Sequence, residues 1–465
     1  MALNEPDKSL LDRLAPFAAP LEPRYLEEPR GRFHGQAAAL LKPRNVAEVS
    51  EILSACNAAR VGVVPYGGGT GLVSGQIFEG TPPPVLLSLE RMNAIRDVDP
   101  ADNVLVAEAG AILADVRAAA ENADRLFPLS LASEGSCRIG GNLATNAGGV
   151  NVLRYGNARD LCLGIEAVLA DGTVFNGLKR LRKDNTGYDL RNLLVGSEGT
   201  LGVITAASLK LFPRPVEVEG AFIAVPSPQA ALDLLHLLAE YFGPMISAFE
   251  LIHRNGLDFL RETGLPCNDP LDSAPEWMVL VECGAGAGSN LRDRLEEALA
   301  QAFDRSLLSD AVLAQNAAQL AAFWNIRETI PEGNRLIGSV SSHDVSVPVS
   351  RVPEFITAGI AAIRAIDPAL RINCFGHLGD GNLHYNVFPP AGTGREVYEP
   401  VKGAVKTAIH DLVDSYGGSF SAEHGVGRLK KHDLLKYGDA GKITAMRAIK
   451  AALDPNGILN PGAVL

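Results

Sequence analysis

The stretch Phe375-Gly-His-Leu-Gly-Asp-Gly-Asn-Leu-His-Tyr-Asn386 is flanked on both sides by apolar, strand-like residues. Its centre reads Gly-Asp-Gly-Asn, and an Asp-Gly pair between two such runs is a strong signal for a hairpin with a two-residue type I′ turn. This turn would pair His377 with His384 across the strands, with their Cβ atoms about 5 Å apart. Two imidazoles at that separation suit a divalent metal, and Asn386 shares their face because it lies two residues beyond His384.

Two histidines alone are equally typical of a glycine-rich hairpin with surface side chains. A second stretch, Ser421-Ala-Glu-His-Gly-Val-Gly427, favours the metal interpretation. Glu423 offers a carboxylate that would complete a site of two histidines and one acid with open positions. His424 would remain for proton transfer, although a Glu-His pair before glycines is by itself also typical of a polar loop.

Length, composition and charge narrow the class of protein. At 465 residues the chain is too long for one ordinary core, which predicts two or three domains. The net charge of −12 argues against a nucleic-acid partner, and no apolar run is long enough for a transmembrane helix. The N-terminus resembles neither a secretory signal nor a transit peptide, so we expect a cytoplasmic location. The six cysteines form no C-x-x-C pair, which predicts reduced thiols and no iron–sulfur cluster.

The first half of the chain carries three glycine-rich loops within one predicted α/β domain, residues 36–215. An apolar strand leads into Pro65-Tyr-Gly-Gly-Gly-Thr-Gly71, whose glycines allow backbone N–H groups to point at an anion. The segment 139–149 has almost no bulky side chains, so a flat ligand could lie against its backbone. The third loop, 196–204, again leads into a strand. Each loop taken singly predicts only a turn or tight helix–sheet packing, and none matches the Rossmann or P-loop fingerprint.

Taken together and in order, these motifs resemble the signature set of the FAD-linked oxidase family, which has the vanillyl-alcohol oxidase/p-cresol methylhydroxylase fold. Within the family they are most similar to the D-2-hydroxyacid dehydrogenase branch, and there to D-2-hydroxyglutarate dehydrogenases. The resemblance implies an α+β fold. Its parts are an N-terminal extension (1–35), a p-cresol methylhydroxylase-type (PCMH-type) FAD-binding domain of two α/β subdomains (36–215), a substrate domain with an antiparallel sheet covered by helices (216–420), and a C-terminal helical segment returning to the flavin (421–465).

The resemblance implies FAD as the cofactor, bound noncovalently because no histidine lies in 65–75 or 128–149 to bond the flavin ring. The residues it places around the pyrophosphate are Pro65, Gly67, Gly68, Gly69, Thr70, Gly71 and Gly75. The residues it places along the flavin and the ribityl chain are Ser133, Gly140, Gly141, Asn142, Thr145, Gly148 and Gly149. It also implies that Ile204 contacts the adenine side and that Asn460 lies near the flavin.

The same resemblance implies oxidation of a D-2-hydroxy acid, in which the hydroxyl loses its proton and the α-hydride passes to flavin N5. A divalent metal on His377, His384 and Glu423 would chelate the substrate hydroxyl and carboxylate together. Zinc is the expected ion, and manganese, cobalt and iron suit the same ligand types. His424 would be the general base, because an imidazole can hold a proton near neutral pH.

Three further residues would bind the substrate. Asn386 would hydrogen-bond it, and Arg327 would bind its carboxylate through the planar guanidinium, although position alone favours a helix-surface salt bridge for Arg327. The 2-hydroxyglutarate enzymes that the chain resembles tend to carry Lys and Thr where this chain has Ser342 and Pro331, and Arg335 is the candidate replacement. The resemblance implies D-2-hydroxyglutarate as the expected substrate, whereas the departures at Ser342 and Pro331 count against a pocket for its distal carboxylate and keep a larger hydrophobic 2-hydroxy acid open. D-lactate, or another monocarboxylic 2-hydroxy acid of the kind used by glycolate oxidase flavin subunits, is the alternative.

The expected electron acceptor is a soluble carrier such as electron-transfer flavoprotein, or a quinone, and a homodimer is the usual assembly. Two other functions fit the fold. One is a nonredox alkyl-transfer enzyme of ether-lipid synthesis, disfavoured because the C-terminal Gly-Ala-Val-Leu is not a peroxisomal signal. The other is a flavin-binding electron-transfer or assembly subunit without catalysis, disfavoured by the full set of metal ligands and a base.

Overall fold

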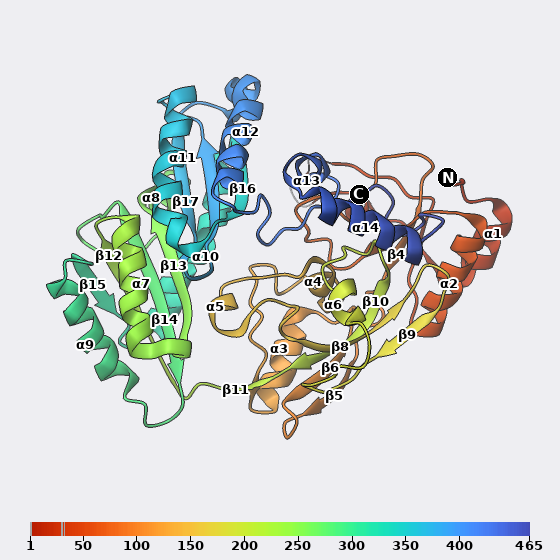
Figure 1. Cartoon of the computed structure of the whole chain (residues 1–465), viewed down its shortest axis with the longest axis horizontal. Helices are drawn as coiled ribbons and strands as arrows, with labels where there is room; N and C mark the ends of the chain where they lie inside the picture. The colour runs from red at the N-terminus through yellow and green to blue at the C-terminus, as the bar shows by residue number, and fades with distance from the viewer. Residues whose placement is uncertain (1, 29–30, 32) are drawn as a thin grey trace. The chain divides into compact units, whose positions relative to one another are not determined.

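The computed structural model, which describes residues 2–28, 31 and 33–465, divides the chain into two units (Figure 1). Unit 1 consists of Met1–Gly149, Gly156–Arg214 and Glu423–Leu465, and unit 2 consists of Val150–Tyr155 and Pro215–Ala422. Two segments depart from the predicted division. The described residues before 36 fall in unit 1 instead of forming a separate extension, and residues 150–155 fall in unit 2.

Unit 1 contains two main sheets, and the first is built around parallel strands. Its order is β1 (Ala18–Ala19), β2 (Ala39–Leu41), β4 (Val85–Ser88) and β3 (Val63–Tyr66). Helix α2 (Val46–Ala59) covers this sheet because its apolar residues recur at helical spacing, and Val49, Ile52 and Leu53 are fully buried. The Asn45 side chain begins the helix by accepting a hydrogen bond from the Glu48 N–H.

The second sheet of unit 1 is antiparallel. Its order is β5 (Ile95–Asp99), β6 (Val104–Glu108), β10 (Val203–Lys210), β8 (Cys162–Val168) and β9 (Val174–Gly177). Every residue of β8 is buried. The glycine-rich helix α4 (Ile139–Thr145) packs against β6 and β10. The C-terminal segment adds α13 (Lys431–Tyr437) and α14 (Ala440–Leu453), and then runs beside β3, where Val63 N–H donates to Ile458 O at 2.8 Å.

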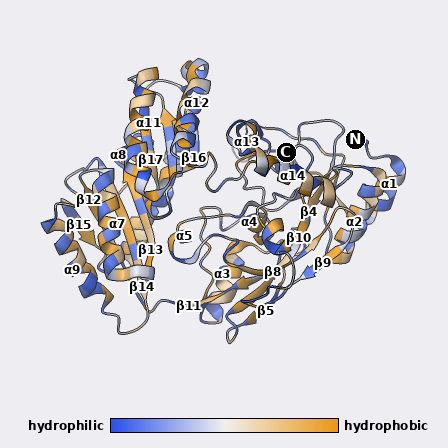
Figure 2. Ribbon diagram, viewed as in Figure 1, coloured by the Kyte–Doolittle hydropathy of each residue, from blue (hydrophilic) through white to orange (hydrophobic). Residues whose placement is uncertain are grey.

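Unit 2 is one seven-stranded sheet in which all neighbours are antiparallel. Its order is β15 (Asp310–Leu313), β12 (Glu217–Val225), β14 (Trp277–Ala285), β13 (Ile246–His253), β17 (Arg371–His377), β18 (Asn382–Phe388) and β16 (Ser341–Ser346). The central strands β13 and β14 are mainly hydrophobic (Figure 2). Such strands are expected where helices cover both faces of a sheet.

Helices cover both faces of this sheet. The first face packs against α7 (Pro228–Phe242), α9 (Leu291–Asp304), α11 (Val352–Ile366) and α12 (Glu399–Ser415), of which α11 and α12 lie side by side (Figure 1). The second face packs against α8 (Arg254–Glu262) and α10 (Ala317–Ile337). Because side chains alternate along a strand, the residues that share this second face can be assigned from the register. Those with polar side chains include Glu250, Glu282, Asn373, His377, His384, Asn386, Ser342 and Asp344.

A short helix from the first half of the chain is part of unit 2. Helix α5 (Val152–Tyr155) contacts β13. Its Arg154 Nη1 bonds to Gly284 O at 2.7 Å, to Ser247 Oγ at 3.2 Å and to Met245 O at 3.3 Å. These bonds explain why residues 150–155 leave the unit that surrounds them in sequence.

The predicted register of the histidine hairpin is wrong by two residues. Phe375, and not His377, is the partner of His384. A type I′ turn needs a positive φ at both central residues, whereas only Gly381 adopts one here (φ 81°). The connection is instead a 3₁₀ turn, Leu378–Asp380, in which Asp380 Oδ1 accepts the Asn382 N–H at 3.0 Å. A shift of two residues keeps His377 and His384 on one face, and their ring centroids are 5.8 Å apart.

Candidate active site

The loop after β3 has the backbone of an anion site. Within the part of the chain that the structure describes, the N–H groups of residues 67–71 donate no hydrogen bond. The Gln76 side chain holds the loop by donating to the carbonyls of Gly69 (3.2 Å) and Gly71 (3.1 Å). Gly69 requires glycine because its φ is 73°. Successive unpaired N–H groups on a glycine-rich loop are suited to a pyrophosphate.

The start of α4 faces this loop and fits a flat ligand. A Cβ atom at Gly141 would meet no heavy atom of the described residues within 4 Å, and one at Gly67 would lie 3.4 Å from Gly141 Cα. Asn142 is buried, and its Oδ1 accepts no hydrogen bond from the described residues. Gly140 differs, because a Cβ there would lie 2.7 Å from Ala109 Cβ, so its small size serves helix–sheet packing. Open space beside an unsatisfied acceptor fits the polar edge of a flavin.

Three other predicted flavin residues make bonds or contacts within the protein. Thr145 Oγ1 donates to Gly141 O at 3.0 Å, and Ser133 O accepts the N–H of Cys137 at 2.8 Å. Gly149 adopts a φ of 101° and leaves no room for a Cβ against Ser130 O. These residues therefore shape the segment, whether or not they also touch a cofactor.

The Glu423–Gly427 motif is attached to the glycine-rich segments of unit 1. Glu423 Oε1 accepts the Gly149 N–H at 2.6 Å, and a Cβ at Gly148 would lie 2.6 Å from the same oxygen. The N–H groups of Val426 and Gly427 donate to the carboxylate of Glu198, at 2.8 and 2.7 Å. Burial raises the pKa of Glu198 above its ordinary 4.5, against the opposing effect of these two N–H groups. The sequence interpretation missed Glu198, although it lies in the predicted loop 196–204.

A second missed residue, Arg428, joins the loops to the C-terminal tail. Its Nη1 donates to Gly75 O at 2.6 Å and its Nη2 to Asn460 Oδ1 at 2.7 Å, while burial lowers its pKa to about 10. Asn460 Nδ2 in turn donates to Glu198 O at 2.8 Å. Ile204, by contrast, is buried in β10 opposite Ala167. The structure therefore brings Gly75 and Asn460 together with the Glu423–Gly427 motif inside unit 1.

In unit 2, both predicted histidine ligands have a carboxylate neighbour. His377 Nδ1 lies 2.6 Å from Glu250 Oε1, and His384 Nδ1 lies 4.0 Å from Asp344 Oδ1. Glu250 is fully buried. Burial alone raises the pKa of Glu250, but His377 and Arg327 outweigh it and lower that pKa to about 2. Glu250 is therefore an anion that accepts the Nδ1–H of His377, which leaves Nε2 as the nitrogen suited to a metal.

Arg327 shares the same carboxylate. Its Nε donates to Glu250 Oε2 at 2.8 Å, and its guanidinium lies 4.7 Å from the centre of the Phe375 ring. The predicted alternative for Arg327 is therefore half right, because the side chain does form an ion pair, but that pair is buried and does not lie on the helix surface. Among the described residues no other group bonds the guanidinium, so its two terminal nitrogens make no hydrogen bond there. These two terminal nitrogens of Arg327 are suited to bind a substrate carboxylate.

The remaining predicted substrate residues lie in different surroundings. Asn386 is buried opposite Asn373 and Ser342, on the face that carries His384. Arg335 is exposed on α10 and pairs with Glu332 at 2.7 Å, so we leave it out of the site. Ser342 is exposed, and its Oγ lies 2.7 Å from Ser339 Oγ.

Comparisons with known proteins agree with this arrangement of motifs. Residues 37–177 match the family described as "FAD binding domain", and residues 214–464 match "FAD linked oxidases, C-terminal domain". The chain belongs to the FAD-linked oxidase family. This oxidase-family chain is 38% identical to the mitochondrial D-2-hydroxyglutarate dehydrogenase of Bos taurus, over 100% of the chain and 84% of the relative. It is 37% identical to the enzyme of that name in Arabidopsis thaliana, over 93% of the chain and 76% of the relative.

The predicted α+β, PCMH-type fold of this FAD-linked oxidase is confirmed. The crystal structure of p-cresol methylhydroxylase superposes with a TM-score of 0.72 at 17% sequence identity, covering 97% of this chain and 92% of the other. Both relatives carry "mitochondrial" in their names, so the cytoplasmic location stays a prediction. Among the described residues, no helix has the length and apolar character that crossing a bilayer requires.

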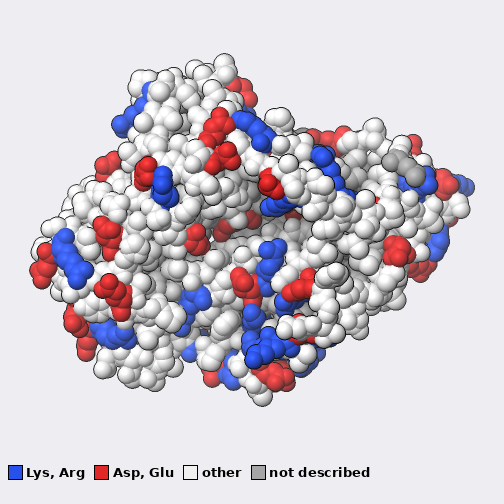
Figure 3. Space-filling model, in the orientation of Figure 1, with Lys and Arg blue, Asp and Glu red and all other residues white. Residues whose placement is uncertain are grey.

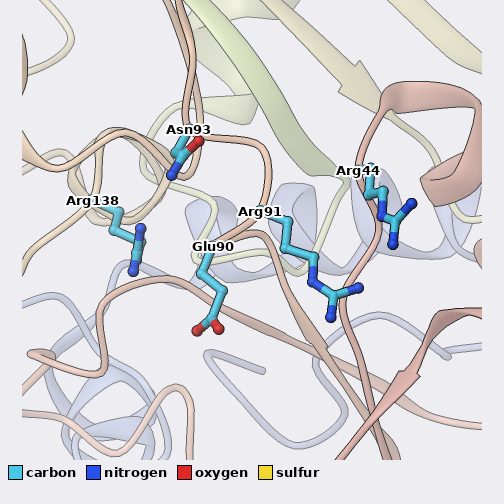
Figure 4. A pocket seen from close by; sticks show the side chains of 5 residues that line it. All are labelled: Arg44, Glu90, Arg91, Asn93 and Arg138. Atoms are coloured by element: carbon cyan, nitrogen blue, oxygen red, sulfur yellow. The ribbon is translucent and has the colours of Figure 1, made fainter.

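The FAD-linked oxidase also has a charged cavity that lies outside the predicted site residues. It measures about 470 Å³ and is lined by Arg44, Glu90, Arg91, Asn93 and Arg138 (Figure 4). The carboxylate of Glu90, which lines the cavity, already accepts hydrogen bonds from Lys42 Nζ at 2.5 Å and from Tyr25 Oη at 2.8 Å. On the face drawn in Figure 3, basic and acidic side chains are interspersed. We assign this cavity no ligand.

Proposed function

We propose that this FAD-linked oxidase is an FAD-dependent dehydrogenase that oxidises a D-2-hydroxy acid, with D-2-hydroxyglutarate as the first-choice substrate. The observation that carries the proposal is that His377, His384, Asn386 and Arg327 lie on one face of the unit 2 sheet or against it. Binding the hydroxyl and carboxylate of a 2-hydroxy acid requires metal ligands, a hydrogen-bonding amide and a guanidinium group. The names of the two relatives support the same substrate class.

FAD would be held by unit 1, without a covalent bond. The N–H groups of residues 67–71 would bind the pyrophosphate, and Gly141 and Asn142 would accommodate the flavin. When bound, FAD supplies the two-electron acceptor for the substrate hydride. The protein's part is to orient the substrate C–H bond and to keep water away from it.

A divalent metal, with zinc as first choice, would be held by His377, His384 and Glu423. Support comes from the donor set and from the Nδ1 bond of His377 to Glu250, which leaves Nε2 as the ring nitrogen for a metal. Ala422, whose N–H donates to Asp344 O at 3.3 Å, is followed directly in the chain by Glu423. When bound at these residues, a divalent cation would supply the positive charge that lowers the pKa of a substrate hydroxyl.

The remaining residues would move the proton and orient the substrate. His424, as a neutral imidazole, would accept the hydroxyl proton. Arg327 would bind the carboxylate through its terminal nitrogens, and Asn386 would hydrogen-bond the substrate. Electrons would then pass to a soluble carrier such as electron-transfer flavoprotein, or to a quinone. We propose a homodimer as the assembly and keep the cytoplasm as the proposed location.

A monocarboxylic substrate such as D-lactate is the second candidate, and one observation favours it. The positions expected to bind a distal carboxylate hold the neutral Ser342 and Pro331, and Arg335 pairs with Glu332 on the exposed side of α10. Positions 331, 335 and 342 therefore provide no cation suited to the distal carboxylate of a dicarboxylate.

Dye-linked turnover by the purified, FAD-loaded protein tests both candidates. D-2-hydroxyglutarate, D-malate and D-lactate are compared side by side, before and after a chelator treatment and after zinc is restored. The proposal predicts the highest kcat/KM with D-2-hydroxyglutarate and activity that returns with zinc. A preference for D-lactate selects the second candidate, and full turnover by metal-free protein rejects the metal-dependent mechanism.

A further inference from the structure

Glu250 is an unusual residue for its place in the fold. It lies in β13, among Ile246, Phe249, Leu251 and Ile252, and its side chain is fully buried beneath α10. A buried carboxylate is unfavourable unless charged or hydrogen-bonding groups compensate it. The identity of its partners therefore indicates what the residue does.

Both oxygens of Glu250 are used, and each holds a different proposed site residue. Oε1 accepts from His377 Nδ1 at 2.6 Å, from the neighbouring strand β17, where the two residues are direct cross-strand partners. Oε2 accepts from Arg327 Nε at 2.8 Å, from the covering helix. One carboxylate thus connects a proposed metal ligand to the proposed carboxylate clamp.

We propose that Glu250 is a positioning residue that fixes His377 and Arg327 relative to each other, an inference that rests on the function proposed above. Its bond to Nδ1 sets the tautomer and ring orientation of His377, so Nε2 is the nitrogen presented to a metal. Its bond to Nε fixes the plane of the Arg327 guanidinium, so both terminal nitrogens are presented to a carboxylate. One anchor would therefore hold both the residue proposed to bind the metal and the residue proposed to bind the substrate carboxylate.

Glu282 provides a matched control. It lies on the adjacent strand β14 and on the same face of the sheet. Its carboxylate also accepts from α10, through Trp324 Nε1 at 2.7 Å, one turn before Arg327. Glu282→Gln therefore alters a carboxylate at the same sheet–helix interface without touching His377 or Arg327.

The experiment compares wild type, Glu250→Gln, Glu250→Asp and Glu282→Gln as full-length, FAD-loaded proteins. Zinc affinity is measured by competition with a chromophoric chelator, together with kcat, KM, flavin content and Tm. For Glu250→Gln we expect zinc affinity to fall roughly 10–100-fold and KM to rise, with flavin content unchanged. Glu250→Asp should retain charge but show an intermediate loss, because its shorter side chain cannot reach both partners. Glu282→Gln should match wild type in zinc affinity and KM.

A double-mutant cycle separates positioning from general stability. In a His377→Ala background, Glu250→Gln should cause no further loss of zinc affinity, because the bond through which it acts is already gone. Wild-type zinc affinity and KM in folded Glu250→Gln, or in Glu250→Asp if the first variant does not fold, would overturn the inference. Equal losses in Glu282→Gln would also overturn it. Failure of the proposed function is distinct, because the wild-type protein itself would then bind no zinc or turn over without it.

Discussion

Gly149 and Glu423 are 274 residues apart in the sequence, yet the Gly149 N–H donates to Glu423 Oε1 at 2.6 Å. The carboxylate predicted to bind a metal is thereby fixed to the backbone predicted to line the flavin. Glu423→Gln keeps an oxygen that can accept this hydrogen bond but removes the charge. We expect kcat with a D-2-hydroxy acid to fall more than about 100-fold. This loss is larger than that caused by mutating most residues that only hydrogen-bond to a metal ligand. Flavin absorbance and kcat of the purified variant measure this, and near-wild-type kcat with FAD bound would exclude Glu423 as a ligand.

The open space beside Gly141 leads to a prediction that distinguishes cofactor binding from folding. A Cβ at Gly141 meets no described heavy atom within 4 Å, and alanine is favoured over glycine in a helix by roughly 0.5–1 kcal/mol. Gly141→Ala should therefore leave the Tm of the FAD-free protein unchanged or slightly higher, while FAD affinity falls. Calorimetry of the FAD-free protein and FAD titration provide the two measurements. Gly135→Ala, where a Cβ also has open space, is the control and should retain wild-type FAD affinity.

Ser342 offers a test of substrate selection. It lies opposite Asn386 on the face that carries His384, and it is exposed. Ser342→Lys would add a cation for a distal carboxylate, and a charge-assisted hydrogen bond contributes about 1.5–3 kcal/mol. We expect the ratio of kcat/KM for D-2-hydroxyglutarate to that for D-lactate to rise about tenfold or more. Ser342→Met supplies similar length without charge, and an equal rise in that variant would show that charge is not the cause.

His253 predicts a pH dependence of stability that is separate from the active site. Burial lowers its pKa from 6.5 to about 4, against a smaller opposing effect of Asp258, and Glu276 Oε1 lies 3.8 Å from Nε2. The folded state therefore disfavours protonation of His253. Its contribution to stability is present above pH 6.5 and is lost as the pH falls towards 4, by no more than roughly 3 kcal/mol.

The variant His253→Asn isolates this contribution, because its Oδ1 can replace Nδ1 as acceptor of the Asn255 N–H at the start of α8. Urea unfolding between pH 4 and 7 should show a steeper loss of the free energy of unfolding in wild type than in the variant. Parallel curves for the two proteins would contradict the prediction.

The histidine hairpin shows which structural features the sequence alone can predict. Alternation along strands correctly placed His377 and His384 on one face, because that property survives a shift of two residues. Their direct pairing was wrong, because the Asp-Gly signal was compatible with more than one turn, and the choice depended on the φ of Asp380. Turn residues thus predicted the hairpin better than they predicted its register.

Glu250 could not have been assigned from sequence, even though a single acid within the apolar run 246–253 was visible. Its two partners are 77 and 127 residues away, so their proximity depends on the complete sheet and its covering helix. Glu198 was missed for the same reason, since it binds the N–H groups of residues 426 and 427. The glycine-rich loops were easier to recognise, because their backbone freedom is a local property.

The pairing of residues 458–460 with β3 links the completion of an early strand to a late part of the chain. Val63 N–H donates to Ile458 O and Asn460 N–H donates to Val63 O, each at 2.8 Å, and Ile458 and Leu459 are fully buried beside this early strand. Part of the core beside β3 is therefore supplied by residues that lie far later in the chain, so this part of unit 1 is complete only when residues 458–460 are in place. Deletion of residues 458–460 should accordingly lower the stability of unit 1.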